Sequence, residues 1–410
     1  MDRDPATTEL DLHGAATVTP AGVSRAPLPI RAGRVGTGTS TRAHRLNLDG
    51  QLVFPGLVNA HDHLHVNAVP PMRMAGKFRN SYEWIEAFKA HFAEPAVAAA
   101  LAVPLEVRMR HGALKNLLAG TTCVAHHDPW HAVCDEPGFP VAVLREYGWA
   151  YAPGWPGYGP DVRRSFLRTP PDRPWIIHLA EGTDAVARAE LARLEAIGCL
   201  APNSVLVHAV GLRKPDVERV IERNAAVVWC PASNHALLGR TIDPRRLFEA
   251  GRLALGTDSR LTGARDMLEE MRGILVRGEL DASHLLELAT TAAARILRMP
   301  WRGSLSPGDK ADLVIVADTG QPGPCTLPGL DRSQLRAVVH DGLPCIADPD
   351  LADWFALAGI DAVPVTLDGK PKLLARSLAD PAVVALEPGL ELGTAATRRQ
   401  RPPVLRAEAC

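Results

Sequence analysis

The strongest constraint on the fold is an alternation of short apolar runs with longer helical segments between about residue 56 and residue 300. Short, nearly continuous apolar strands are typical of parallel sheets, because helices cover both faces of such sheets. The apolar runs are residues 56–60, 121–125, 148–152, 175–177, 204–207, 226–229 and 252–255. The helical segments are residues 82–92, 97–118, 184–197, 214–223, 266–276 and 281–298.

Seven such runs in this span favour an eight-stranded barrel over an open sheet, because (β/α)8 TIM barrels typically take roughly 250 residues. We therefore predict a distorted α/β barrel of this kind over residues 56–302. The pattern shows no convincing fourth strand between Tyr151 and Trp175, and residues 161–167 are the candidate for a reduced replacement. Such a replacement would leave that side of the barrel mouth open or differently built.

Both ends of the chain show the short alternating pattern of β-strands, broken by glycine and proline. We predict one small β-sandwich domain built from both ends, with residues 1–55 as its N-terminal part and residues 303–392 as its C-terminal part. Residues 393–410 are rich in arginine, proline and small side chains, and we expect them to form a flexible tail.

Charge and cysteine content exclude several classes of protein. Lysine and arginine total 45 against 46 aspartate and glutamate, so the chain lacks the basic surface of a nucleic-acid binder. The first residues are polar, and no apolar stretch reaches the ~20 residues that cross a bilayer, so we expect no membrane partner. Seven scattered cysteines without a CxxC pair predict a reducing, cytoplasmic location.

Polar residues that suit metal binding follow several of the apolar runs. The first run leads into His61 and His63, and later runs lead to His178, His208 and Asp258. In a βα barrel the C-terminal ends of the strands meet at one mouth, and residues two apart on a strand point the same way. Neutral imidazoles with one carboxylate match the ligand preferences of Zn²⁺ and Fe²⁺. The sequence therefore predicts a metal site at the barrel mouth.

Five stretches in order resemble motifs of the amidohydrolase superfamily, over about residues 50–317. PGLVNAHDH at residues 55–63 resembles the first-strand motif of that family. HLAE at 178–181, VH at 207–208, WCPASN at 229–234 and LGTD at 255–258 are similar to its fifth to eighth strand ends. They resemble the mononuclear branch that contains deaminases and chlorohydrolases. Residues 303–314 resemble the stretch that returns to the β domain.

The resemblance implies four metal ligands, which are His61, His63, His178 and Asp258. It also implies that Glu181 moves protons, that Asp258 accepts the proton of a metal-activated water, and that His208 holds a developing oxyanion. No lysine stands where binuclear members carry a carbamylated lysine. We therefore expect one divalent metal ion, with Zn²⁺ preferred and Fe²⁺ left open.

Three further residues are weaker candidates for contact with substrate. His65 would lie on the side of the strand that carries His61 and His63, although a plain loop role fits it equally. His127 follows the second run and would touch substrate or orient a metal ligand, and Asn234 follows the seventh run. Three tryptophans are candidates either for a pocket wall or for ordinary core: Trp84, Trp130 and Trp155.

The resemblance implies a metal-dependent hydrolase that acts on a C–N bond, other than a peptide bond, of a small polar molecule. Hydrolytic deamination is the preferred reaction. Hydrolysis of an amide, a cyclic amide or a carbon–halogen bond on the same site remains an alternative, as does a catalytically silent binding protein. The expected partners are a small-molecule substrate and, in a homodimer, a second copy of the chain. The sequence does not identify the substrate.

Overall fold

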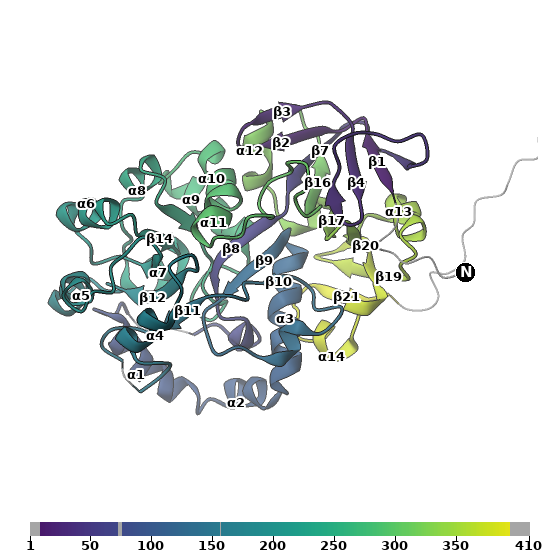
Figure 1. Cartoon of the computed structure of the whole chain (residues 1–410). Helices are drawn as coiled ribbons and strands as arrows, with labels where there is room; N and C mark the ends of the chain where they lie inside the picture. Colours follow the sequence, from purple (N-terminus) through teal and green to yellow (C-terminus); the bar gives the residue numbers. More distant parts are fainter. Residues whose placement is uncertain (1–8, 73–75, 156, 394–410) are drawn as a thin grey trace, which may run out of the picture.

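The fold is mixed α/β with parallel sheets, as the computed structural model of the chain shows (Figure 1). The structure describes residues 9–72, 76–155 and 157–393. The predicted flexible tail, apart from Gly393, lies outside the described residues.

The strands of the described chain are β1 (Leu10–His13), β2 (Ala16–Thr19), β3 (Gly22–Ser24), β4 (Leu28–Arg31), β5 (Arg34–Val35), β6 (His44–Asn47), β7 (Gln51–Pro55), β8 (Leu57–Asp62), β9 (Thr121–His126), β10 (Ala142–Val143), β11 (Gly148–Ala150), β12 (Trp175–Leu179), β13 (Ser204–His208), β14 (Ala226–Trp229), β15 (Leu253–Leu255), β16 (Leu313–Ala317), β17 (Leu335–His340), β18 (Leu343–Ala347), β19 (Ala362–Leu367), β20 (Lys370–Ala375) and β21 (Leu390–Leu392). The α-helices are α1 (Ser81–His91), α2 (Pro95–Ala102), α3 (Leu105–Leu118), α4 (Val162–Arg168), α5 (Ala185–Ala196), α6 (Lys214–Glu222), α7 (Pro231–Leu238), α8 (Arg245–Glu249), α9 (Met267–Arg277), α10 (Ala282–Leu288), α11 (Thr291–Ile296), α12 (Gly323–Thr326), α13 (Ala352–Leu357) and α14 (Pro381–Val384).

The strands from β8 to β15 are parallel and form two hydrogen-bonded sheets, in the orders β10-β9-β8 and β11-β12-β13-β14-β15. Hydrogen bonds join the first of these strands to the segment after the last. The backbone N–H groups of Thr257 and Asp258 donate to the carbonyl oxygen of His61 at 3.1 and 3.0 Å. The C-terminal ends of β8 and β15 therefore lie side by side. Every residue of β8, β12, β13 and β14 is buried, which explains why the apolar runs are continuous.

The expectation about a missing fourth strand was wrong in position and in kind. The strand that the pattern missed is β10, which lies before β11 and has only two residues, too few to form a recognisable run. Residues 161–167 do not replace a strand, because Val162–Arg168 is helix α4. Asp161 caps this helix by accepting a hydrogen bond from the backbone N–H of Arg164 at 2.8 Å.

Strands from both ends of the chain share one nine-stranded sheet, in the order β21-β19-β20-β18-β17-β16-β7-β2-β3. Figure 1 shows these purple, green and yellow strands together on the side away from α5 and α6. β1, β4, β5 and β6 form a separate four-stranded sheet. The chain passes from the shared sheet into the parallel strands at Gly56, where a Cβ would lie 2.3 Å from the hydroxyl oxygen of Thr122. Only glycine fits this junction.

No helix among the described residues is long and apolar enough to cross a membrane.

Candidate active site

The predicted site residues lie at the C-terminal ends of the parallel strands. His61 lies in β8, His178 lies in β12, and His208 ends β13. His208 and Asp258 have φ values of +71° and +57°, in the left-handed region that residues other than glycine rarely adopt. Backbone strain of this kind concentrates at functional sites, because the surrounding structure must hold it in place.

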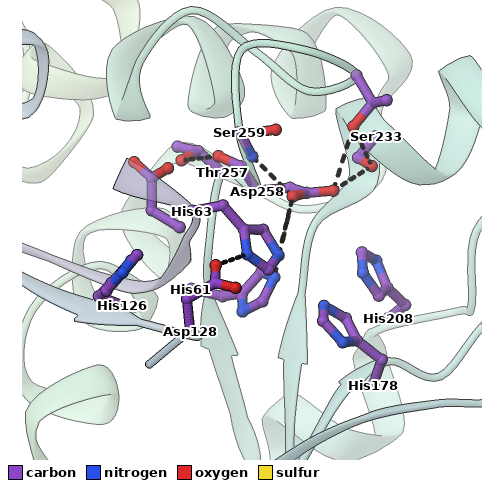
Figure 2. Close-up of polar contacts among 12 residues, drawn as sticks. His61, His63, His126, Asp128, His178, His208, Ser233, Thr257, Asp258 and Ser259 are labelled. Carbon is purple, nitrogen blue, oxygen red and sulfur yellow. Dashed lines mark hydrogen bonds and ion pairs between the residues drawn. The ribbon is translucent and has the colours of Figure 1, made fainter. Parts of the chain in front are cut away.

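These strand ends bring the side chains together around one space, as Figure 2 shows for His61, His63, His178, His208 and Asp258. Oδ1 of Asp258 lies 3.9 Å from Nε2 of His61 and 3.7 Å from Nε2 of His63. The ring of His178 lies 5.0 Å from that of His61, measured between centroids. The structure thus groups all four predicted ligands.

His127 belongs to the same group, whereas the sequence suggested that it contacts substrate or orients a metal ligand. Its ring stacks on that of His178 with the centroids 4.3 Å apart. Possible ligand atoms of His61, His127 and His178 lie within 4.8 Å of one another, and so do those of His61, His63 and Asp258. His61 is common to both groups. We call His61, His63, His127, His178 and His208 the imidazole cluster.

His61 gives the clearest indication that the imidazole cluster accommodates a cation. It is fully buried, and neither of its ring nitrogens has a hydrogen-bond partner among the described residues. Burial, together with the neighbouring histidines, holds the pKa of His61 well below its usual value. A buried polar atom without a partner costs about 1–3 kcal/mol, and a neutral imidazole is a good ligand for a divalent metal. The donor set therefore fits such an ion.

Two other imidazoles are oriented through one ring nitrogen, which leaves the second nitrogen for a ligand. Nδ1 of His63 pairs with Oδ2 of Asp128 at 2.5 Å, and Nδ1 of His178 pairs with the carbonyl oxygen of Tyr151 at 2.9 Å. Although burial alone would lower it, the pKa of His63 is raised by Asp128. Metal-binding histidines usually carry such partners, which fix the ring and its tautomer.

Glu181 and His208 face each other at the side of the cluster. Oε2 of Glu181 lies 3.9 Å from Nε2 of His208, and its Oε1 accepts a hydrogen bond from Nε1 of Trp84 at 3.0 Å. Burial raises the pKa of Glu181, although the nearby imidazole of His208 acts in the opposite direction. A carboxyl group with a raised pKa is suited to carrying a proton near neutral pH.

Asp258 is held by hydroxyl groups on the side away from the histidines. Its Oδ2 accepts hydrogen bonds from Ser233 at 2.7 Å and from Thr262 at 3.3 Å. Its Oδ1 accepts the backbone N–H of Ser259 at 2.7 Å and faces His61. Both oxygens of Asp258 therefore accept hydrogen bonds that fix the side chain, and Oδ1 also points at the imidazole cluster.

The weaker candidates for substrate contact lie in different places. His65 lines the cavity, with Nδ1 3.5 Å from Oδ2 of Asp128. His127 is buried behind His178, and its Nε2 bonds to the carbonyl of Ala150 at 3.0 Å. Asn234 is buried behind His208 and pairs with Nδ1 of that ring at 2.9 Å, so the structure gives it a role in orienting His208.

A cavity of about 790 Å³ opens above the cluster, within the range typical of small-molecule sites. Its floor contains His63, His178, Glu181, His208 and Asp258. Trp84 and Trp155 line it, as one interpretation of the sequence suggested. Trp130 instead donates to Asp135 outside the cavity, at 3.0 Å.

A buried polar network beneath the cluster was missed by the sequence analysis. Asp62 ends β8 between His61 and His63 in the sequence, and its carboxylate accepts hydrogen bonds from Lys115 at 3.1 Å, Asn116 at 2.8 Å and Asn67 at 2.8 Å. The amide of Asn59 donates to Asn116 at 3.0 Å. We call these five residues the paired layer. The signal for it was a Lys-Asn pair inside the apolar stretch 113–118 of α3.

Comparisons with known proteins found sequences similar to parts of this chain. A model described as the amidohydrolase family matches residues 172–363. A 5-methylthioadenosine/S-adenosylhomocysteine deaminase of Syntrophobacter fumaroxidans is 36% identical over 161 residues, which cover 35% of this chain and 37% of the relative. A protein of the same name from Teredinibacter turnerae is 26% identical over 343 residues, covering 67% of this chain and 74% of the relative. The chain thus spans little more than a third of the first of these relatives.

Solved structures share the fold. An adenosine deaminase from Xanthomonas campestris with bound zinc has a TM-score of 0.65 at 22% identity, with 86% of this chain and 97% of that chain covered. The atrazine chlorohydrolase TrzN from Arthrobacter aurescens, complexed with zinc, has a TM-score of 0.64 at 19% identity, with 85% of this chain and 100% of that chain covered.

Proposed function

We propose that this chain is a member of the amidohydrolase superfamily and a metal-dependent hydrolase of a small molecule, acting on a C–N bond other than a peptide bond. Hydrolytic deamination is the reaction that we favour, since the two relatives described above are named as deaminases. One observation carries the proposal. Four imidazoles and two carboxylates meet at the C-terminal ends of parallel strands, and all of them except His61 line the floor of a cavity of small-molecule size.

The proposal includes the finer architecture. The strands β8–β15 form a distorted (β/α)8 barrel over residues 56–302, and the sheets at the two chain ends form a β-sandwich domain. The hydrogen bonds from Thr257 and Asp258 to His61 support closure between the first and last parallel strands. The sharing of one sheet by β7 and β16 supports a common domain for the two ends.

The metal in this proposal is one divalent ion, with zinc preferred over iron. It would be held by four residues, namely His61, His63, His178 and Asp258. The unpartnered nitrogens of His61 and the oriented rings of His63 and His178 support this assignment. A bound ion of this type lowers the pKa of a water molecule toward 7 and polarises the bond that is attacked.

The chain's own residues supply the proton movements. Oδ1 of Asp258 faces the floor of the cavity and would accept the proton of the attacking water. The raised pKa of Glu181 lets this carboxyl carry a proton to the departing nitrogen. In its doubly protonated form, in which Nδ1–H donates to Oδ1 of Asn234, His208 would present Nε2–H to the negative charge that develops on the substrate.

The test combines metal content with product release. We expect about one equivalent of zinc or iron per wild-type chain, lost in His178→Ala, and ammonia release from amino-heterocycles by the wild type. Glu181→Gln should keep the metal and the fold and lower kcat by about 10²–10⁴-fold. Glu146→Gln, which changes an exposed glutamate outside the cavity, is the control. The same incubations, assayed for chloride from chlorinated heterocycles, would reveal carbon–halogen hydrolysis instead.

A wild-type protein that binds neither zinc nor iron after both are supplied would contradict the proposal. Unchanged turnover in Glu181→Gln would contradict the role of Glu181 alone.

A further inference from the structure

Part of the cavity wall is apolar and has no role in the proposed reaction. It is formed by apolar side chains, which we call the apolar rim: Val66, Ile85, Phe88, Phe92, Trp155 and Leu261. We propose that the apolar rim binds an uncharged, apolar substituent of a flat amino-heterocycle whose amino carbon reaches the imidazole cluster. This inference rests on the proposed function and names the substrate class that the same cavity selects.

Helix α1 supplies one wall of the rim through apolar side chains that are only partly buried. Ile85, Phe88 and Phe92 are spaced three and four residues apart, so they share one face of the helix, and all three line the cavity. Within α1 only Ser81 and His91 are fully buried. A helix whose apolar face borders a cavity gains stability when a ligand removes that face from water.

Trp155, another residue of the rim, is held against Tyr82 of α1, so the rim exists before any ligand arrives. The ring of Trp155 stacks on that of Tyr82 with centroids 6.1 Å apart and planes 6° from parallel. The backbone N–H of Gly154 donates to the hydroxyl of Tyr82 at 2.9 Å, and this hydroxyl in turn donates to the buried carboxylate of Glu190. A wall held in this way loses little freedom on binding, which favours affinity.

The charges around the rim disfavour an ionic substituent. Lys89 is the single lysine or arginine among the described residues that line the cavity. Its ammonium group is paired with Glu86 at 2.6 Å and lies 5.3 Å from the ring centroid of Trp155. An anionic substituent would therefore meet a cation that is already paired. A cationic substituent would meet the ammonium group of Lys89.

The rim and the floor are joined through one tryptophan. Trp84 lines the cavity, its ring lies 6.1 Å from that of Phe88 between centroids, and it donates its indole N–H to Glu181 at 3.0 Å. A ring seated against this indole would place one edge near Glu181 while its substituent points toward Phe88 and Phe92. The cavity can therefore hold the amino carbon of such a substrate near Glu181 and its apolar substituent against the apolar rim.

The experiment uses three adenine derivatives that differ only in the substituent at N9, which is benzyl, carboxymethyl or 2-aminoethyl. Equilibrium dissociation constants are measured by calorimetry on zinc-loaded Glu181→Gln protein, and kcat/KM for ammonia release is measured on zinc-loaded wild type. We expect the benzyl compound to bind about 10- to 100-fold more tightly than either charged one, because it buries an aromatic group.

Phe92→Arg, made in both backgrounds, tests the rim directly. Phe92 is 39% exposed, so an arginine there is compatible with the fold, and it should shift the preference toward the carboxymethyl compound. The matched control is Leu392→Arg, at a leucine that is 40% exposed in β21, away from the cavity. This control should leave the preference unchanged.

The outcomes separate the rim from the proposed function. A benzyl preference in binding without ammonia release would overturn deamination while supporting the rim. Ammonia release from all three compounds at equal efficiency, with equal dissociation constants, would overturn the rim while supporting deamination. No binding of any of the three compounds, or an unchanged preference in folded Phe92→Arg, would also overturn the rim.

Discussion

Two neighbouring residues on strand β8 belong to regions that differ in whether their buried polar atoms have hydrogen-bond partners. His61 belongs to the imidazole cluster, where both of its buried ring nitrogens lack a partner among the described residues. Asp62, the next residue, belongs to the paired layer, where its carboxylate accepts hydrogen bonds from Lys115, Asn116 and Asn67. Both residues are fully buried.

The difference shows which polar groups serve the fold and which serve a ligand. A buried charge is tolerated when it is paired and hydrogen-bonded, as that of Asp62 is. A buried polar atom without a partner lowers the stability of the fold, unless a bound ion coordinates it or a bound molecule forms a hydrogen bond with it. We therefore expect substitutions in the paired layer to change stability, and substitutions near the imidazole cluster to change metal binding and turnover.

The largest effect is expected from Lys115→Met, because it leaves the buried carboxylate of Asp62 without its cation. We expect the free energy of unfolding, measured by urea denaturation, to fall by about 3–5 kcal/mol. Lys310→Met removes an ion pair of Asp341 whose side chains are 29% and 37% exposed, and it should cost less than about 1 kcal/mol. Equal losses in the two variants would break the distinction between the paired layer and the surface.

Glu387→Gln tests an extension of the paired layer and its dependence on pH. The buried carboxylate of Glu387 pairs with His111, Arg260 and Arg332, and these partners hold its pKa below the usual range although burial acts in the opposite direction. A depressed pKa stabilises the fold above the pKa of an unfolded glutamate, about 4.3, and this stability is lost as pH falls toward the folded-state value.

We therefore expect Glu387→Gln to cost about 1.5–3 kcal/mol at pH 7 and progressively less below about pH 4. Calorimetric unfolding of both proteins between pH 7 and pH 3 measures this difference. A difference that stays constant with pH would show that the charge of Glu387 does not matter.

Asp128→Asn tests whether a residue that orients one proposed metal ligand affects metal binding rather than stability. Asp128 orients His63, so its loss should weaken zinc affinity by about 10- to 100-fold in a chelator competition. Asp135→Asn, at a carboxylate that is 50% exposed, is the control and should bind zinc as the wild type does. If Asp128→Asn alters unfolding but not zinc affinity, then Asp128 belongs with the structural network.

The smallest effect is expected from Ser233→Ala, because Thr262 also donates to the same oxygen of Asp258. Losing one hydrogen bond of about 0.5–1.5 kcal/mol should lower kcat/KM by roughly 2- to 10-fold. Ser333→Ala removes a similar hydroxyl–carboxylate bond to Asp331, at 2.7 Å, outside the site and should leave kcat/KM unchanged. A loss in Ser333→Ala as large as that in Ser233→Ala would remove any special role for Ser233.

The sequence predicted what depends on local patterns. Seven of the eight strands from β8 to β15 are apolar runs, and His61, His178 and His208 follow or end such runs, so their convergence could be anticipated from barrel geometry. The remaining strand of this set, β10, has only two residues and is recognised by its hydrogen bonds to β9. A local sequence pattern does not contain that information.

Contacts between distant residues could not be predicted in the same way. Lys115 and Asp62 are 53 positions apart, and nothing near either residue indicates the other. Asn234 follows a strand end, as a substrate-contacting residue would, yet the turn of its helix places it behind His208. Periodicity gives the direction of a side chain along its own element, and the partner across the fold depends on tertiary packing.

The bond between Glu387 and Arg260 has a consequence for how the protein is made. Arg260 lies two residues after Asp258, and its guanidinium group pairs with a carboxylate that is 127 positions further along the chain. A ribosome must therefore synthesise and release the segment around Glu387 before the loop that carries Asp258 acquires its buried counter-charge. Proteolysis between the parallel strands and α14 would remove this partner, even though every proposed metal ligand lies on the other fragment.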